Sequence, residues 1–255
     1  MSLVDRADVV IVGGAIIGSS VATFLASRPD FDGRIVVVER DPTFRTSSTT
    51  LSAASIRLQF STPLNIEISR FGLEVLRHPE RVLGDAAASI GLDFVENGYL
   101  FLATDAGLGG LEQNHAVQRE HGVRVELLTP PELTRRFSWL NAEGLAAGSL
   151  GLGDEGWFDA YALLQAFRRR ASSLGVEERP GEVAGLEVAD ERVTQVRLAD
   201  GTAIEAEWVV NAAGPRAAEV AAMAGVELPV RPRKRNVYHV ASPAHLGDAP
   251  LTVDP

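Results

Sequence analysis

The sequence contains no cysteine, and lysine occurs only once, at Lys234. The missing thiols exclude disulfides, thiolate zinc sites and cysteine nucleophiles. Basic residues are also outnumbered, because 24 Lys and Arg stand against 34 Asp and Glu, which gives a formal net charge of −10. A chain this acidic is a poor partner for nucleic acids and for anionic membrane surfaces. We therefore expect no nucleic-acid partner.

Long hydrophobic runs are absent as well. The apolar run from Val9 to Gly18 is much shorter than the roughly 18 residues that a membrane-spanning helix requires. Asp5 and Asp8 precede this run and no A-x-A cleavage site follows it, so it lacks the form of a signal peptide. The sequence therefore predicts a cytoplasmic protein with no membrane span.

The first forty residues have the pattern of a βαβ unit. Residues 8–12 form a β-branched run without polar alternation, which is typical of a strand buried on both faces. A glycine-containing turn at 13–18 follows, and the apolar residues after it recur at the spacing of one helical face. Residues 34–39 then supply a second buried strand. This order predicts a dinucleotide-binding fold; the alternative is a parallel α/β domain whose glycines serve only packing.

Each position of the turn has a physical purpose in such a fold. Gly13 permits the tight turn, and Gly18 lets the helix pack closely against the strand. Ala15 stands where the fingerprint has its middle glycine, and its methyl group leaves slightly less clearance for a phosphate. The helix N-terminus offers free N–H groups to a pyrophosphate. Glu39 ends the second strand, where an acidic side chain can accept hydrogen bonds from ribose hydroxyls.

The residues after Glu39 do not continue as alternating strands and helices. A hydroxyl-rich stretch at 40–50 leads into a segment at 51–63 that contains Arg57, Gln59, Phe60 and Ser61. These features resemble the FAD-dependent oxidoreductases of the D-amino-acid oxidase and sarcosine oxidase superfamily, most of all its bacterial sarcosine-oxidase-like branch. Four further segments resemble motifs of that superfamily in the same order, at 98–103, 127–133, 154–164 and 209–215.

The resemblance implies an α/β architecture of two interleaved domains. An FAD-binding, Rossmann-like parallel sheet with a β-meander takes residues 1–80 and 150–225. A mixed-sheet substrate domain takes residues 81–149 and 226–255. It also implies that this second domain is incomplete, so we expect the 255 residues alone to be a poor catalyst.

The resemblance further implies a bound FAD. Because no cysteine exists and no histidine lies between Glu39 and Arg77, we expect the flavin to be held non-covalently. The residues expected to bind it are Gly13, Gly14, Ala15, Ile16, Ile17, Gly18, Glu39, Arg40, Ser47, Ser48, Val183, Ala213 and Gly214.

The activity that the resemblance implies is oxidation of the C–N bond of an amino acid or N-methyl amino acid, with hydride transfer to the flavin. Arg57 and Gln59 are the candidate catalytic residues. Arg57 can bind a substrate carboxylate as a bidentate pair, although a salt bridge or a phosphate contact explains an arginine there equally well. We expect no metal site, because the spacing of the five histidines matches no ligand motif; they are His78, His115, His121, His239 and His245.

Two other functions stay open at this point. The first is a nicotinamide-dependent dehydrogenase built on the Rossmann fold, which would normally continue with βαβ units after Glu39. The second is a non-catalytic protein that keeps the flavin fold in order to bind or assemble with a partner. In the leading interpretation the partner is a small amine or amino-acid substrate, and the sequence does not predict an oligomeric state.

Overall fold

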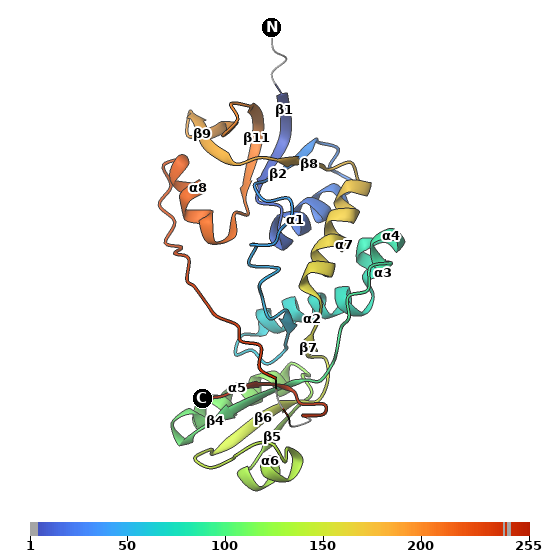
Figure 1. The fold of residues 1–255 in the computed structure, drawn as a ribbon, viewed down its shortest axis with the longest axis vertical. Helices are drawn as coiled ribbons and strands as arrows, with labels where there is room; N and C mark the ends of the chain where they lie inside the picture. The colour runs from blue at the N-terminus through green and yellow to red at the C-terminus, as the bar shows by residue number, and fades with distance from the viewer. Residues whose placement is uncertain (1–4, 242, 244–245) are drawn as a thin grey trace. The chain divides into compact units, whose positions relative to one another are not determined.

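A computed structural model describes residues 5–241, residue 243 and residues 246–255 (Figure 1). The chain divides into two compact units. Unit 1 takes the described residues up to Ser52, then Leu83–Gly91 and Ala160–Asn236. Unit 2 takes Ala53–Val82, Leu92–Asp159 and the described residues from Val237 onward. Each unit is therefore assembled from three separate segments of the chain.

The centre of unit 1 is a mixed sheet. Its strands are β1 Asp5–Val12, β2 Ile35–Glu39, β8 Glu177–Pro180, β9 Val183–Ala189, β10 Arg192–Leu198 and β11 Ala203–Asn211. Among the described residues they pair in the order β8-β2-β1-β11-β10-β9. β8, β2, β1 and β11 are parallel, and β11, β10 and β9 form an antiparallel meander. The predicted parallel sheet with a β-meander is confirmed.

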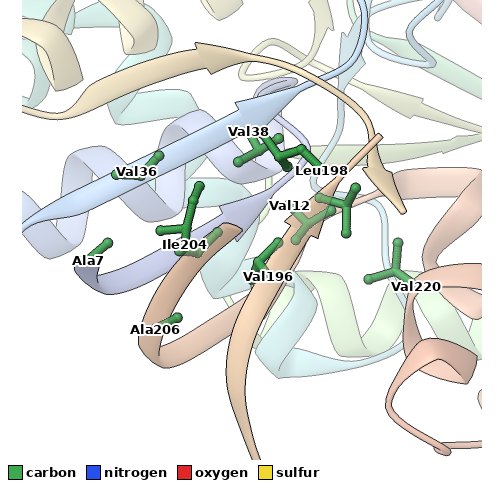
Figure 2. Packing of buried hydrophobic residues seen from close by; sticks show 11 residues of the cluster. Ala7, Val12, Val36, Val38, Val196, Leu198, Ile204, Ala206 and Val220 are labelled. Carbon is green, nitrogen blue, oxygen red and sulfur yellow. The ribbon is translucent and has the colours of Figure 1, made fainter. Parts of the chain in front are cut away.

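Both faces of the sheet are buried at β1 and β2, as their β-branched runs predict. On one face, Val12, Val36 and Val38 pack with Val196 of β10 and Val220 of α8 Ala217–Met223 (Figure 2). On the other face, alternate residues of β1 and β2 pack against α1 Ile16–Ala26 and α7 Ala160–Ser173. Because side chains alternate along a strand, only a run of apolar residues can supply both layers. The short elements α4 Asp85–Ala88 and η1 Gly214–Arg216 complete unit 1.

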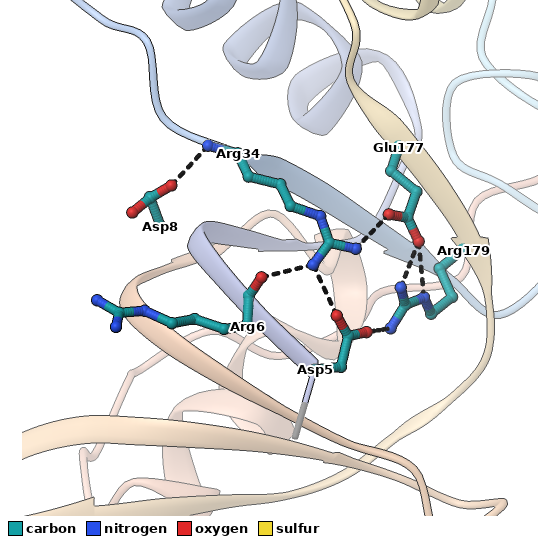
Figure 3. Close-up of polar contacts among 6 residues, drawn as sticks. All are labelled: Asp5, Arg6, Asp8, Arg34, Glu177 and Arg179. Carbon is teal, nitrogen blue, oxygen red and sulfur yellow. Dashed lines mark hydrogen bonds and ion pairs between the residues drawn. The ribbon is translucent and has the colours of Figure 1, made fainter. Parts of the chain in front are cut away.

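An ion-pair network joins β1, β2 and β8 at the end of the sheet where these strands begin. The Asp5 carboxylate accepts hydrogen bonds from Arg34 and Arg179, and Glu177 pairs with the same two arginines (Figure 3). The hydrogen bond from Arg34, followed by that from Arg179, lowers the pKa of Asp5 below its ordinary value. The carboxylate therefore stabilises the folded state at neutral pH.

This arrangement predicts a pH-dependent effect of Asp5→Asn. Since the folded-state pKa is lowered, the contribution of Asp5 is complete above the ordinary aspartate range near pH 4 and is lost as the pH falls through the folded-state pKa. We expect a loss of about 1 kcal/mol or less at pH 7, because the pairs are partly exposed. Urea unfolding at several pH values measures it. A difference between mutant and wild type that persists unchanged at pH 3 and below would contradict this, and exposed Asp32→Asn is the control.

Unit 2 contains two sheets. In the sequence, most of its helices lie between the strands of these sheets. Among the described residues, the larger sheet has the order β12-β4-β6-β5, in which β12 and β4 are parallel and the other pairs antiparallel. A two-stranded sheet pairs β3 with β7. The strands are β3 Ser55–Ile56, β4 Tyr99–Ala103, β5 Val125–Leu128, β6 Ala147–Gly151, β7 Gly156–Trp157 and β12 Leu251–Val253. The helices are α2 Pro63–Arg77, α5 Asp105–Glu120, α6 Pro130–Arg136 and α3 Pro79–Leu83, whose last residue belongs to unit 1.

The predicted fold class, a Rossmann-like sheet with a second, mixed sheet, agrees with this structure. The two compact units follow the packing of the chain and not contacts to a ligand, so the predicted limits of a cofactor domain and a substrate domain stay a prediction. No helix formed by the described residues has both the length and the apolar character to cross a membrane.

Candidate functional site

The predicted cofactor residues of unit 1 gather at one edge of its sheet. β1 ends at Val12 opposite Asn211 of β11, and β2 ends at Glu39 opposite Pro180 of β8. These four parallel strands therefore finish side by side, and the segments that follow them share the carboxyl edge. In open α/β sheets this edge is where ligands bind.

The turn after β1 is shaped by two glycines. Gly13 has a φ of +100°, a conformation that L-residues with side chains rarely adopt, and its N–H donates to the Val38 carbonyl at 2.9 Å. A Cβ on Gly13 would lie 2.5 Å from the Ala212 carbonyl oxygen. A Cβ on Gly18 would lie 1.8 Å from the Gly13 carbonyl oxygen. The backbone after β1 thus packs directly against both helix α1 and the segment after β11.

Helix α1 begins at this turn with free backbone donors. Ala15 is its N-cap and makes no side-chain capping bond. The first-turn N–H groups have no partner within the helix, and the Ile16 N–H donates to Thr49 Oγ1 at 3.3 Å. Ile17, in the same turn, is 63% exposed. Free N–H groups at a helix N-terminus fit the pyrophosphate of a dinucleotide, and the contact of this turn with a cofactor stays a prediction.

Glu39 holds the turn and the end of β2 together. Its carboxylate accepts a hydrogen bond from the Gly14 N–H and another from the Asp41 N–H, both at 2.8 Å. An ionised carboxylate has about four lone-pair positions, so it can also accept a ribose hydroxyl. Its role toward ribose stays a prediction, whereas its role in ordering the glycine turn was not foreseen from the sequence.

The hydroxyl-rich loop after β2 is anchored by a buried aromatic ring. Phe44 is 2% exposed and has a φ of +56°, and the Arg168 guanidinium lies 4.5 Å from the centre of its ring. Ser47 Oγ hydrogen-bonds Thr50 Oγ1 at 3.1 Å, and Ser48 is exposed. Ser47 and Ser48 thus lie on an ordered loop at the carboxyl edge, and their contact with a cofactor stays a prediction.

The other predicted residues follow β2, β8 and β11. Val183 is buried in the core, whereas Gly214 is exposed with open space at its Cβ position. Glu182 receives a hydrogen bond from Arg216 at 2.8 Å and lies 3.9 Å from Arg40. Ionic contacts of Glu182 therefore link the segments that follow β2, β8 and β11. The Ala213 N–H donates a hydrogen bond to Asn211 Oδ1 at 3.3 Å, which fixes the backbone that follows β11.

The two predicted catalytic residues lie in unit 2, immediately after β3. The Arg57 guanidinium lies 4.8 Å from the ring centre of Phe60, 5.2 Å from that of Phe101 and 6.0 Å from that of Tyr99. Gln59 is 7% exposed, and its amide is fully used inside unit 2. Their catalytic roles stay predictions.

Sequence reasoning missed Glu155, which is 0% exposed. Its carboxylate accepts hydrogen bonds from the Leu58 N–H at 2.6 Å, the Gln59 N–H at 3.0 Å and Gln59 Nε2 at 2.9 Å. Burial raises the pKa of Glu155, while these hydrogen bonds act in the opposite direction. The sequence shows only a charged residue between glycines, next to a strand. This pattern does not indicate that the charge is buried.

Metal ligands are not grouped in the described part of the chain, where no three His, Asp or Glu side chains could hold a metal ion. His245 lies outside the described residues.

Unit 2 also has a hollow of about 510 Å³ that includes none of the predicted site residues. It is lined by Glu96, Asn97, Arg136, Phe137, Leu150, Gly151, Leu152, Gly153, Asp248 and Pro250.

Comparison with known proteins identifies relatives along nearly the whole chain. Residues 8–255 match the family described as FAD dependent oxidoreductase, DAO. The chain is 41% identical to FAD-dependent oxidoreductase domain-containing protein 1 of Xenopus laevis over 98% of its own length, and covers 57% of that protein. It is 29% identical to the mitochondrial sarcosine dehydrogenase of Homo sapiens over 89% of its length, and covers 25% of that protein.

Among solved structures, L-proline dehydrogenase from P. horikoshii has a TM-score of 0.74 and 27% identity; the match covers 88% of this chain and 57% of that one. The chain therefore spans little more than half the length of the Xenopus relative. The predicted resemblance and the FAD cofactor are confirmed at the level of the family, which favours flavin over the nicotinamide alternative. The chain belongs to the DAO family of FAD-dependent oxidoreductases.

Proposed function

We propose that unit 1 binds FAD non-covalently and that the protein oxidises the C–N bond of a small amino acid or N-methyl amino acid. The observation that supports this most is the gathering of the glycine turn, Glu39 and the segment after β11 at one edge of the sheet. The names of the relatives, a sarcosine dehydrogenase and an L-proline dehydrogenase, indicate the substrate class.

The residues that would hold FAD have separate tasks. The N–H groups of Ile17 and Gly18 would bind the pyrophosphate, and Glu39 would accept a ribose hydroxyl. Val183 would place its backbone beside the adenine, and Gly214 leaves room for close approach of the cofactor. Bound FAD supplies the acceptor for the substrate hydride, so the protein contributes binding, orientation and charge.

Arg57 is proposed to bind the substrate carboxylate. Within the described part of the chain its guanidinium makes no hydrogen bond or ion pair, which favours this role over a structural salt bridge. The nearby rings of Phe60 and Phe101 would restrain the guanidinium while its N–H groups bind a planar carboxylate. A bidentate pair of this type fixes both the position and the orientation of an amino-acid substrate.

The visible absorption spectrum of the purified protein tests the cofactor, and a substrate panel tests the reaction. We expect a flavin spectrum that passes into the filtrate after denaturation, and bleaching of that spectrum by sarcosine, N,N-dimethylglycine, glycine or L-proline under anaerobic conditions. A protein that takes up no FAD, both as this chain and at the full length of its relatives, would refute the proposal. Bound flavin that no amine reduces would instead support the non-catalytic alternative.

Replacing Arg57 with alanine should weaken substrate binding selectively. A lost charge-assisted pair is worth about 1.5–3 kcal/mol, so we expect KM for the amino-acid substrate to rise about 10- to 100-fold. Steady-state kinetics measure the effect by comparing the amino-acid substrate with the corresponding amine that lacks the carboxylate. The FAD content of the protein should not change. Arg119→Ala, on the exposed side of α5, is the matched control. An unchanged KM in Arg57→Ala would remove Arg57 from the site.

A further inference from the structure

The buried carboxylate of Glu155 connects parts of unit 2 that are distant in sequence. Its Oε1 accepts the N–H groups of Leu58 and Gln59, and its Oε2 accepts Gln59 Nε2. Gly151 makes room for it, since a Cβ at Gly151 would lie 1.8 Å from Oε2. The chain therefore places a carboxylate directly against the segment that follows Arg57.

The same network extends to the strands that carry the aromatic residues around Arg57. Gln59 Nε2 also donates to the Tyr99 carbonyl at 3.1 Å, and Gln59 Oε1 accepts the Ser149 hydroxyl at 2.8 Å. The Tyr99 hydroxyl hydrogen-bonds Ser55, and its ring stacks on Phe101 with centroids 5.8 Å apart. Both the backbone beside Arg57 and part of its aromatic surroundings are thus tied to Glu155.

A neutral side chain cannot reproduce these contacts. The partners of the carboxylate are N–H donors, and an ionised carboxylate only accepts. A leucine at 155 has a similar size but no acceptor, so it would leave the N–H groups of Leu58 and Gln59 and the Gln59 amide group without this partner. A buried charge is expensive for a protein to keep if packing is its only purpose, so a specific geometric role is indicated.

We propose that Glu155 is a positioning residue, whose carboxylate holds the Leu58–Gln59 backbone and so places the Arg57 guanidinium for binding a substrate carboxylate. This rests on the proposed function of Arg57. Glu155 itself does not need to touch the substrate. Its effect reaches the substrate through two residues of backbone and through the ring of Tyr99.

Amide hydrogen exchange tests the positioning without any activity. In Glu155→Leu, which removes both oxygens, we expect the amides of Leu58 and Gln59 to exchange at least 10-fold faster than in the wild type, and Glu155→Asp, which keeps the charge, to recover part of the protection. Leu133→Ala is the matched control, because Leu133 is also 0% exposed in unit 2 but packs in a different cluster. Exchange at Leu58 and Gln59 that is no faster in Glu155→Leu than in Leu133→Ala would overturn the proposal.

Calorimetric binding of sarcosine and of dimethylamine to the protein loaded with reduced FAD, which cannot accept a hydride, tests the consequence under anaerobic conditions. The two probes differ by one carboxylate group, so a merely destabilised protein should lose affinity for both. We expect Glu155→Leu and Arg57→Ala each to raise the Kd of sarcosine at least 10-fold and to leave that of dimethylamine unchanged.

The outcomes separate the two proposals. Sarcosine affinity that falls in Arg57→Ala but not in Glu155→Leu would overturn the positioning role while Arg57 keeps its function. Affinity that falls in neither variant would overturn the role of Arg57, and with it the positioning role. FAD content, read from the flavin spectrum of the same samples, shows separately whether the cofactor site of unit 1 has survived.

Discussion

Replacing Gly18 with alanine is expected to abolish FAD retention and to destabilise unit 1 by about 3 kcal/mol or more. The added Cβ would lie 1.8 Å from the Gly13 carbonyl oxygen and 3.3 Å from Ile11 Cγ2. The first of these atoms belongs to the backbone of the glycine turn, so no flexible side chain can move away. Helix α1 would have to shift from β1, and its first-turn N–H groups would leave the carboxyl edge of the sheet.

Two measurements check this result, the FAD content of the purified protein and the midpoint of urea unfolding. Gly110→Ala is the matched control, because Gly110 lies within α5 and a Cβ there would meet nothing within 4 Å. Alanine has the better helix propensity, so this control should gain up to about 1 kcal/mol. Full FAD content in Gly18→Ala would show that the turn tolerates a shift of α1 and that close packing there is not required.

The cofactor edge of unit 1 could be predicted from the sequence because its determinants are local. β1, the turn, α1 and β2 are consecutive in the sequence. Apolar runs such as residues 9–12 and 35–38 predict that these strands are buried on both faces. Gly13 and Gly18 were identified by position, and the structure gives the reason in each case as a contact with backbone. The β-meander was implied by the family resemblance, and the structure forms it from β9, β10 and β11.

The surroundings of Arg57 could not be predicted in the same way. The hydrogen bond between Gln59 and Glu155 joins positions 96 residues apart, and that between Gln59 and Ser149 joins positions 90 apart. Whether a glutamate is buried depends on donors that only the folded chain brings to it. The aromatic contacts of Arg57 likewise come partly from β4, which no local pattern places beside residue 57. The sequence indicated this arginine by resemblance, whereas its environment required the structure.

Replacing Glu39 with glutamine should weaken FAD binding by about 10- to 100-fold, since one charge-assisted hydrogen bond is worth about 1.5–3 kcal/mol. Two losses combine in this variant. The negative charge that would accept a ribose hydroxyl disappears, and one of the N–H groups of Gly14 and Asp41 must face an NH₂ group in place of an oxygen. The glycine turn and the end of β2 would then lose the link that the carboxylate provides.

Titration of the apoprotein with FAD, followed by quenching of flavin fluorescence, measures the change in Kd. Glu207→Gln is the matched control, because Glu207 lies on β11 of the same sheet and its side chain is exposed.

The two functions of Glu39 can be told apart by the unfolding free energy of the apoprotein. If only ribose binding is lost, the apoprotein is as stable as the wild type. If the carboxylate also orders the turn, as its contacts with Gly14 and Asp41 indicate, the apoprotein loses about 1–3 kcal/mol before any cofactor is added. An unchanged FAD affinity would place the ribose elsewhere on the carboxyl edge of unit 1.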